Sequence, residues 1–283
     1  WNAAFFPAGD VLLLFVVVGV VLFLTRSWSD RAIGVAAVVL LLQPVEWYHY
    51  IANLINPAHR LPDLKVAEMY GEVADYTKAG NWRDFLLGNV TLGQKASFLW
   101  AVNAGRFVQT AGLFLLGFFI GRKQLFMTNE KNIVFWTKVL IISAISFAPL
   151  YTLKELVMEN DPIVQQTVGT AFDMWQKLSF TLVLVASFIL LYQHKNFSKA
   201  VAGLRFYGKM SLTNYISQSI IGAFIYFPIG LNLAPYCGYT LSLSVGFLIF
   251  LLQLKFCKWW LARHKQGPLE YIWHKCTWIG TGK

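Results

Sequence analysis

The stretch "QPVEWYHY" at residues 43–50 puts a carboxylate and an imidazole at the end of a long apolar run. Glu46 and His49 are three residues apart, so on a helix they share one face. A carboxylate that orients an imidazole is a common arrangement for moving a proton, and we predict His49 and Glu46 as catalytic residues. The alternative is that both groups simply reach the headgroup region among Trp47, Tyr48 and Tyr50.

Arg106 is the second candidate, because it lies about ten residues into the apolar stretch that begins near residue 97. An arginine at that depth needs a carboxylate, a bound anion or a group of carbonyls. On one continuous helix, Asn103 and Thr110 would share its face and Gln109 would lie beside it. We predict Arg106, Asn103 and Gln109 as substrate-binding residues. A structural ion pair between Arg106 and Glu46 is the alternative.

A third set of polar side chains opens the apolar stretch at residues 211–233, in "GKMSLTNYISQS". Three hydrogen-bonding residues recur at helical spacing and a tyrosine flanks them, which suits either a polar ligand or hydrogen bonds between helices. Two cations just before this stretch could meet phosphate. The predicted substrate-binding residues of this set are Ser211, Asn214, Tyr215, Gln218, Arg205 and Lys209.

The composition sets the class of protein that must hold these groups. The chain has 283 residues, of which 57% are hydrophobic and 13% charged, whereas soluble domains have about 25% charged residues. This indicates a multi-pass membrane protein, with one transmembrane domain over residues 1–283. The three cysteines show no metal-binding or paired spacing, and the chain contains no phosphate-binding loop and no hydrolase or zinc-protease motif. We therefore expect no metal.

About seven stretches are apolar enough to be spans, and no period-two alternation is present, so the expected fold is an all-α polytopic bundle. Pro44 predicts a kink in the second span, and "GFFIG" at residues 117–121 predicts close helix packing. For the loop of about 40 residues, 54–96, the sequence predicts either an amphipathic helix near residues 64–76 or an ordered structural loop. The expected spans are residues 9–25, 32–53, 97–121, 133–153, 174–192, 211–233 and 239–261.

Basic residues alternate between the loops in a way that predicts the orientation. Fifteen lysines and arginines fall on one set of loops and six on the other. The positive-inside rule then puts residue 1 outside and the C-terminus in the cytoplasm of a bacterial inner membrane. The net charge of +10 is explained by this sidedness and by contact with anionic lipid, so we expect no nucleic-acid partner. We also expect an odd number of spans upstream of residue 1.

The C-terminal third, residues 203–283, resembles the YeiB family of bacterial inner-membrane proteins, defined by domain of unknown function 418. That family has a Gly-basic-Met-Ser/Ala-Leu-Thr-Asn-Tyr run ending in Gln-Ser, and a Gly-Pro-Leu/Val-Glu-Trp-Leu-Trp tail. Tyr271 replaces the common first tryptophan of the tail. The matching residues are Gly208, Lys209, Met210, Leu212, Thr213, Asn214, Tyr215, Gln218, Ser219, Gly267, Pro268, Leu269, Glu270 and Trp273.

The resemblance implies a multi-pass fold and a distant similarity to membrane acyltransferases. Two functions are therefore considered first. One is an acyltransferase-like enzyme that takes acyl-CoA from the inside and acylates an outer glycan or lipid-linked acceptor. The other is a transporter for a small anion or lipid-linked solute. A non-catalytic subunit of a membrane complex, or of an oligomer, is the third possibility. Membrane lipids are expected partners in each case.

Overall fold

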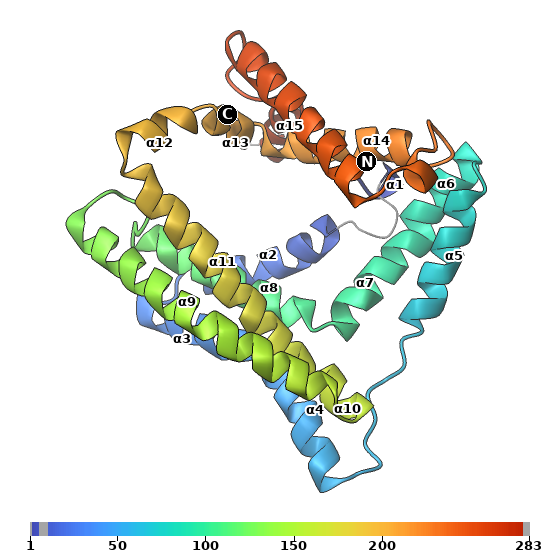
Figure 1. The fold of residues 1–283 in the computed structure, drawn as a ribbon, viewed down its shortest axis with the longest axis vertical. Coiled ribbons are helices and arrows are strands. Elements are labelled where there is room, and N and C mark those ends of the chain that lie inside the picture. The colour runs from blue at the N-terminus through green and yellow to red at the C-terminus, as the bar shows by residue number, and fades with distance from the viewer. Residues whose placement is uncertain (1, 6–10, 280–283) are drawn as a thin grey trace. The chain divides into compact units, whose positions relative to one another are not determined.

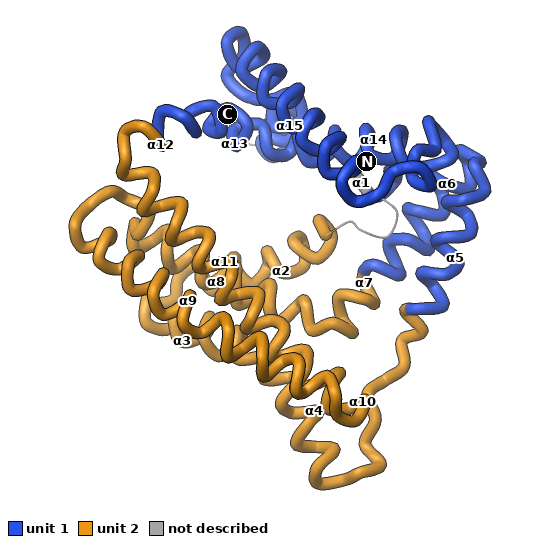
Figure 2. The backbone as a smooth tube through the Cα atoms, in the orientation of Figure 1, with its two compact units in different colours: residues 1–10, 67–97, 198–283 blue, residues 11–66, 98–197 orange. Residues whose placement is uncertain are grey.

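The computed structural model describes residues 2–5 and 11–279, and the regular structure within these residues is helical. This confirms the prediction of an all-α fold. The chain forms two compact units (Figure 2). Unit 1 comprises residues 1–10, 67–97 and 198–283, and unit 2 comprises residues 11–66 and 98–197. The division does not test the prediction of a single domain over residues 1–283.

Unit 2 consists of helices that pack in pairs (Figure 1). The long helices α9 (Glu130–Met158) and α11 (Thr170–Tyr192) lie along one another, and α8 (Arg106–Arg122) packs on both α2 (Leu12–Thr25) and α3 (Asp30–Leu41). Buried aliphatic side chains of α3 and α8 form its core, with Ile33, Ala37 and Leu115 at the centre. Burial of these side chains away from water favours this packing.

Four shorter elements complete unit 2. Helix α4 (Pro44–Ile55) follows α3 directly, and it contacts the short helix α10 (Pro162–Val164) and the π-helical turn η2 (Gln165–Gly169). Helix α7 (Gln94–Asn103) enters unit 2 from unit 1 and leads to α8.

Unit 1 gathers segments from both ends of the chain. Phe85, Ala223 and Ile229 form its buried cluster, with Phe5 and Phe227 packed against it. The cluster therefore joins α1, α6 and the end of α14. The helices of unit 1 are α1 (Asn2–Phe5), α5 (Val66–Lys78), α6 (Trp82–Gly88), the π-helical turn η1 (Asn89–Gly93), α12 (Lys195–Ala200, shared with unit 2), α13 (Leu204–Lys209), α14 (Ser211–Tyr226), the 3₁₀ turn η3 (Ala234–Tyr236), α15 (Tyr239–Leu261) and α16 (Pro268–Thr277).

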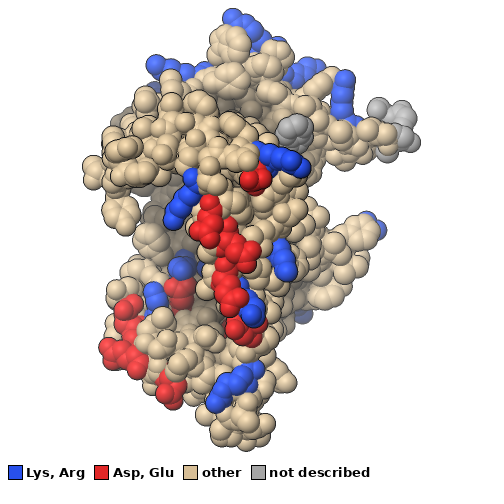
Figure 3. All heavy atoms as spheres, turned by 90° about the vertical axis from the view of Figure 1, so that its right-hand side faces the viewer, with Lys and Arg blue, Asp and Glu red and all other residues tan. Residues whose placement is uncertain are grey.

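Helix α5 is the amphipathic helix that the loop sequence predicts. Met69, Val73 and Thr77 are buried at a spacing of four residues, whereas the acidic side chains are exposed, and Figure 3 shows a column of acidic side chains on this part of the surface. Burial raises the pKa of Tyr76 to about 12, so its hydroxyl stays protonated. It donates a 2.8 Å hydrogen bond to Oδ1 of the buried Asn89, which fixes α5 against η1.

Three helical stretches of the described chain are long and apolar enough to cross a membrane: α9, Pro162–Tyr192 and α15. Two bent pairs pass the same test, α3 with α4 and Trp82–Asn103 with α8, which raises the number to at most five. The predicted seven spans are not confirmed. Helix α2 has 14 residues and α14 has 16, and each is shorter than the roughly 20 residues that a span needs.

The close helix packing predicted for Gly117 and Gly121 is wrong. A Cβ built at either position would meet nothing within 4 Å. The close approach occurs instead at Gly112, where a Cβ would lie 2.9 Å from Cγ of Leu41 and 3.2 Å from Cβ of Leu40. The small residue that lets α3 and α8 approach is therefore one turn and a half nearer the start of α8.

Alanine at these two glycines of α8 should have opposite effects. Gly112→Ala is expected to destabilise the protein by about 1–3 kcal/mol, because the methyl group overfills the contact with α3. Gly117→Ala is expected to stabilise it by up to about 1 kcal/mol, because alanine favours a helix and nothing obstructs the methyl group. Thermal unfolding of the detergent-solubilised full chain measures both, and a Gly112→Ala variant as stable as Gly117→Ala would contradict the packing.

Candidate functional site

The first helix break in unit 2 separates α3 from α4. Gln43 takes a left-handed conformation with φ 59°, Pro44 opens α4, and the two helices bend by 47°. This confirms the predicted kink, because proline supplies no N–H to the preceding turn. The carbonyl of Leu41 accepts a 2.8 Å hydrogen bond from Nε1 of Trp175 on α11. A side chain of α11 thus satisfies a backbone group near the break.

The second break separates α7 from α8, and here the predicted continuous span is wrong. Gly105 has φ 61° and the helices bend by 77°. Glycine adopts this left-handed conformation without steric cost, since it has no Cβ. The bend puts Asn103 at the exposed end of α7 while Arg106 opens α8. The prediction that Asn103 shares a helical face with Arg106 and Thr110 is therefore wrong.

The two breaks meet at the carboxylate of Glu46. A Cβ at position 105 would lie 2.5 Å from Oε1 of Glu46 and 3.4 Å from Cε of Met174, so the carboxylate rests on the bare Cα of Gly105. Glu46 is 5% exposed. It lies beside the first turn of α8. The absence of a side chain at Gly105 is what admits it.

Arg106 stands at the start of α8 but does not pair with Glu46. Among the described residues, no ion pair joins the two side chains, so the alternative of a Glu46–Arg106 ion pair is wrong. Nη1 of Arg106 donates a 2.7 Å hydrogen bond to Oε1 of the buried Gln109, and the guanidinium lies 5.5 Å from the ring centre of Trp100. Its Nε is buried without a hydrogen-bond partner, as is Nε2 of Gln43. Unit 2 therefore keeps two unused donors.

His49 pairs with His59 rather than with Glu46. Nδ1 of His49 and Nε2 of His59 are 3.1 Å apart, with ring centres 5.4 Å apart and planes inclined by 22°. The distance between the ring centres exceeds the distance between the nitrogens by about two imidazole ring radii. Both nitrogens therefore lie on the line that joins the ring centres. This is the geometry of an N–H···N hydrogen bond, with one proton shared between the two nitrogens.

The turn after α4 holds His59 in this position. Nδ2 of Asn53 donates to the carbonyl of His59 at 3.0 Å, and the guanidinium of Arg60 donates to the carbonyls of Pro57 and His59. If His49 donates through Nδ1, its Nε2 carries the free lone pair of a proton acceptor. The residue hydrogen-bonded to the His49 ring is thus His59 and not Glu46.

In unit 1, the polar residues of α14 form hydrogen bonds between helices. Nε2 of Gln218 donates to the Tyr207 hydroxyl at 2.6 Å and to Oε1 of Gln253 at 2.9 Å, and Nδ2 of Asn214 donates to the Tyr207 carbonyl at 3.0 Å. Burial raises the pKa of Tyr207, which stays protonated and donates to Gln253. These bonds tie α13, α14 and α15 together. They are the alternative that the sequence left open for Asn214 and Gln218.

A second set of hydrogen bonds joins α14 to α16. Oε1 of Glu270 accepts from the backbone N–H of Thr213 at 3.0 Å, and Oε2 accepts from its hydroxyl at 2.5 Å. The carboxylate thus caps the first turn of α14. A Cβ at Gly267 would overlap Oε2 of Glu270, so glycine is required there.

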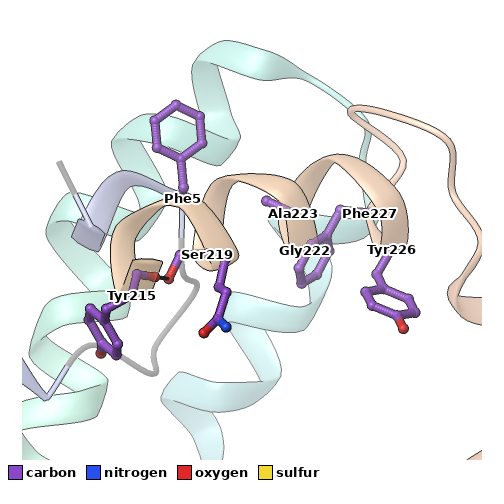
Figure 4. A pocket seen from close by; sticks show the side chains of 8 residues that line it. Phe5, Tyr215, Ser219, Gly222, Ala223, Tyr226 and Phe227 are labelled. Carbon is purple, nitrogen blue, oxygen red and sulfur yellow. Dashed lines mark hydrogen bonds between the residues drawn. The ribbon is translucent and has the colours of Figure 1, made fainter. Parts of the chain in front are cut away.

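The remaining predicted residues lie on the surface of unit 1. Ser211, Arg205 and Lys209 are exposed, and Arg205 lines a hollow of about 500 Å³ with Lys199 and Lys258. Tyr215 and Gln218 line a mainly apolar pocket of about 410 Å³ along α14. Tyr215 and Tyr226 point to the same side of this helix (Figure 4).

Comparison with known proteins identifies a family. Residues 120–280 match the family described as "Protein of unknown function (DUF418)". The chain belongs to the DUF418 family. This confirms the resemblance carried by the α14 and α16 motifs, and the Thr213–Glu270 contact joins both halves of that resemblance.

Two relatives come from bacilli. The chain is 25% identical over 95 residues to "Uncharacterized protein YxaH" of Bacillus subtilis (strain 168), covering 34% of this chain and 24% of that protein. It is 37% identical over 91 residues to "Uncharacterized 39.9 kDa protein in amylase 3'region" of Bacillus acidopullulyticus, covering 31% and 25%. The chain thus spans about a quarter of each relative. No solved structure matches it.

The contact between Glu46 and Gly105 can be tested with a double-mutant cycle. Gly105→Ala is expected to destabilise the protein by about 2–4 kcal/mol, from left-handed strain and from overlap with the carboxylate. In the Glu46→Ala background the overlap is gone, so Gly105→Ala should cost only the strain of about 1–2 kcal/mol there, and the losses of the two single variants should not add. Thermal unfolding of the three variants measures the coupling. Strictly additive losses would show that the carboxylate does not rest on residue 105.

Proposed function

We propose that this DUF418 protein is a membrane acyltransferase-like enzyme, which moves an acyl group from acyl-CoA to an outer glycan or lipid-linked acceptor. The observation that carries the proposal is the head-on His49–His59 hydrogen bond. Acyl transfer to a hydroxyl needs a base that is held in one orientation, and a second hydrogen-bonded group supplies that. In the tautomer in which His49 donates through Nδ1 to His59, Nε2 of His49 is free to take a proton. Unit 2 holds this pair together with an arginine that has an unused buried donor.

In the proposed reaction, Nε2 of His49 takes the proton of the acceptor hydroxyl. The acceptor oxygen attacks the thioester carbonyl, and the C–O bond forms. Arg106 stabilises the oxyanion through its free donor. The C–S bond then breaks, and the leaving thiolate takes the proton back from the imidazolium. Atoms and electrons balance with no further reactant, and Glu46 acts by fixing the α7–α8 break that positions Arg106.

The proposed setting is a bacterial inner membrane, with residue 1 outside and the C-terminus in the cytoplasm. The alternation of basic loops supports this orientation. Membrane lipids and an outer acceptor are the proposed partners, and the seven-span topology belongs to the same proposal, with α2 and α14 as two of the spans.

Native cysteines test the proposed orientation. A membrane-impermeant maleimide should label Cys237 in intact cells, since this residue lies in a turn proposed to face outward, and should leave Cys276 unlabelled. Permeabilised cells should label both, whereas the buried Cys257 stays protected. Labelling of Cys276 in intact cells would contradict the orientation.

If the protein is an acyltransferase, substitution of His49 should specifically lower the rate of acyl transfer. In proteoliposomes of the full-length protein with radiolabelled acetyl-CoA, His49→Gln should lower the rate of acyl transfer by about 10²–10⁴-fold, the usual worth of a general base. His59→Gln should lower it less and should alter the pH profile, because the base stays but loses its orienting partner. His274→Gln, on the exposed side of α16, is the matched control and should keep full activity. Equal rates in His49→Gln and His274→Gln would refute the proposal.

A transporter of a small anion is the second candidate, and the meeting of two broken helices at Glu46 favours it. Transporters form solute sites from interrupted helices whose half-helix ends face the solute. The same proteoliposomes discriminate between the two functions: uptake of an anion in unmodified form, lost in Arg106→Ala and kept in the exposed-residue control Arg83→Ala, would favour transport. Acyl transfer without uptake would exclude it.

A further inference from the structure

A basic hollow lies where α13 and α15 end in unit 1. Its volume is about 460 Å³, and its lining includes Lys209, Arg263, His264 and Lys265 without any carboxylate. Phe206 and Leu261 supply apolar walls. Three permanent cations around one concavity repel one another, so an anion that binds there gains from all of them at once.

No acidic residue is available nearby in sequence to neutralise this charge. Residues 174–269 contain nine lysines and arginines and no aspartate or glutamate. The first carboxylate after that stretch is Glu270, and both of its oxygens are bonded to Thr213. Among the described residues, no ion pair engages the cations of the hollow. Nη1 of Arg263 donates a 3.4 Å hydrogen bond to the Trp259 carbonyl, and the charges of the three cations are not neutralised by a carboxylate within the described chain.

Two side chains of the hollow are held in position by tryptophans. The His264 ring stacks on Trp260 with centres 4.1 Å apart, and its Nδ1 lies 3.2 Å from the Trp260 carbonyl. Because a carbonyl oxygen only accepts, Nδ1 carries a proton, and Nε2 can donate to an anionic ligand when the ring is protonated at both nitrogens. The Arg263 guanidinium lies 5.0 Å from the Trp259 ring centre. The hollow is therefore partly preorganised, and tryptophans of this kind are typical of the headgroup region.

We propose that this hollow binds a phosphate group. Phosphate presents several anionic oxygens to converging donors, and the planar guanidinium fork matches it well. Two ligands could carry that group to the end of a membrane helix: an anionic phospholipid headgroup or a soluble phosphate ester. The inference does not depend on acyl transfer, since it rests on the charge and shape of unit 1 alone.

The test uses the full chain in neutral detergent, where no anionic bilayer surface attracts ligands unspecifically. The probes are dioleoyl phosphatidylglycerol, measured by native mass spectrometry, and coenzyme A, measured by calorimetry. Lys209→Gln/Lys265→Gln should weaken binding roughly 25-fold, since each basic residue contributes about fivefold. The matched control Lys131→Gln/Lys138→Gln, on α9, should change it less than twofold.

A charge-preserving variant separates loss of the site from loss of folding. Lys209→Arg/Lys265→Arg should bind as the wild type does. Selective loss of phosphatidylglycerol in the glutamine variant identifies a lipid headgroup, and selective loss of coenzyme A identifies a soluble ester. Equal binding by the glutamine variant and its control, or no binding of either probe to the wild type, would overturn the proposal.

Discussion

The structure of unit 2 depends on the cost of leaving polar groups unsatisfied where a helix is interrupted among apolar side chains. Each interruption leaves backbone N–H and C=O groups without their partners in the helix. Polar side chains lie beside these groups within an otherwise apolar run. The Leu41 carbonyl accepts a hydrogen bond from Trp175, and the Glu46 carboxylate lies against the open Cα of Gly105 at the start of α8. Helix α11, which supplies Trp175 and Met174, thereby ties both interruptions to the α9–α11 pair.

The sequence predicted one interruption and missed the other for a physical reason. Pro44 removes a hydrogen-bond donor wherever it stands, so its kink can be inferred locally. Gly105 only permits a left-handed turn, and the same residue is tolerated inside many helices. The break at Gly105 coincides with a contact to Glu46, some sixty residues earlier in the chain, and the pattern of one segment does not reveal such a contact. The prediction of close packing at Gly117 and Gly121 failed for the same reason, since the spacing of these glycines does not show which face of α8 meets α3.

The candidate site was predicted in part. Glu46, Arg106 and Gln109 do lie at the helix breaks, because burying an ionisable group in an apolar run strongly limits where it can point. His59 was missed, since it follows α4 in a turn where helical periodicity no longer applies. The signals that could have identified it are the polar turn formers Asn56 and Pro57 before it, which indicate a chain reversal back toward α4. Glu46, the nearest carboxylate in the sequence, was therefore predicted as the partner of His49. His59, which the turn brings back toward α4, is the actual partner.

The motifs that identify the family and the residues suited to chemistry lie in different units. Thr213, Glu270 and Gly267 form one contact between α14 and α16, and Asn214 and Gln218 bond to α13 and α15. These residues are explained by the need to satisfy polar groups between closely packed helices, and their donors and acceptors are already engaged. In unit 2, by contrast with these motif residues, donors on Arg106 and Gln43 are buried and unused, and Gln94 at the start of α7, in unit 1, has a third such donor. Because a fold tolerates such groups only against a cost, unused buried donors point to ligand chemistry more strongly than the family motifs do.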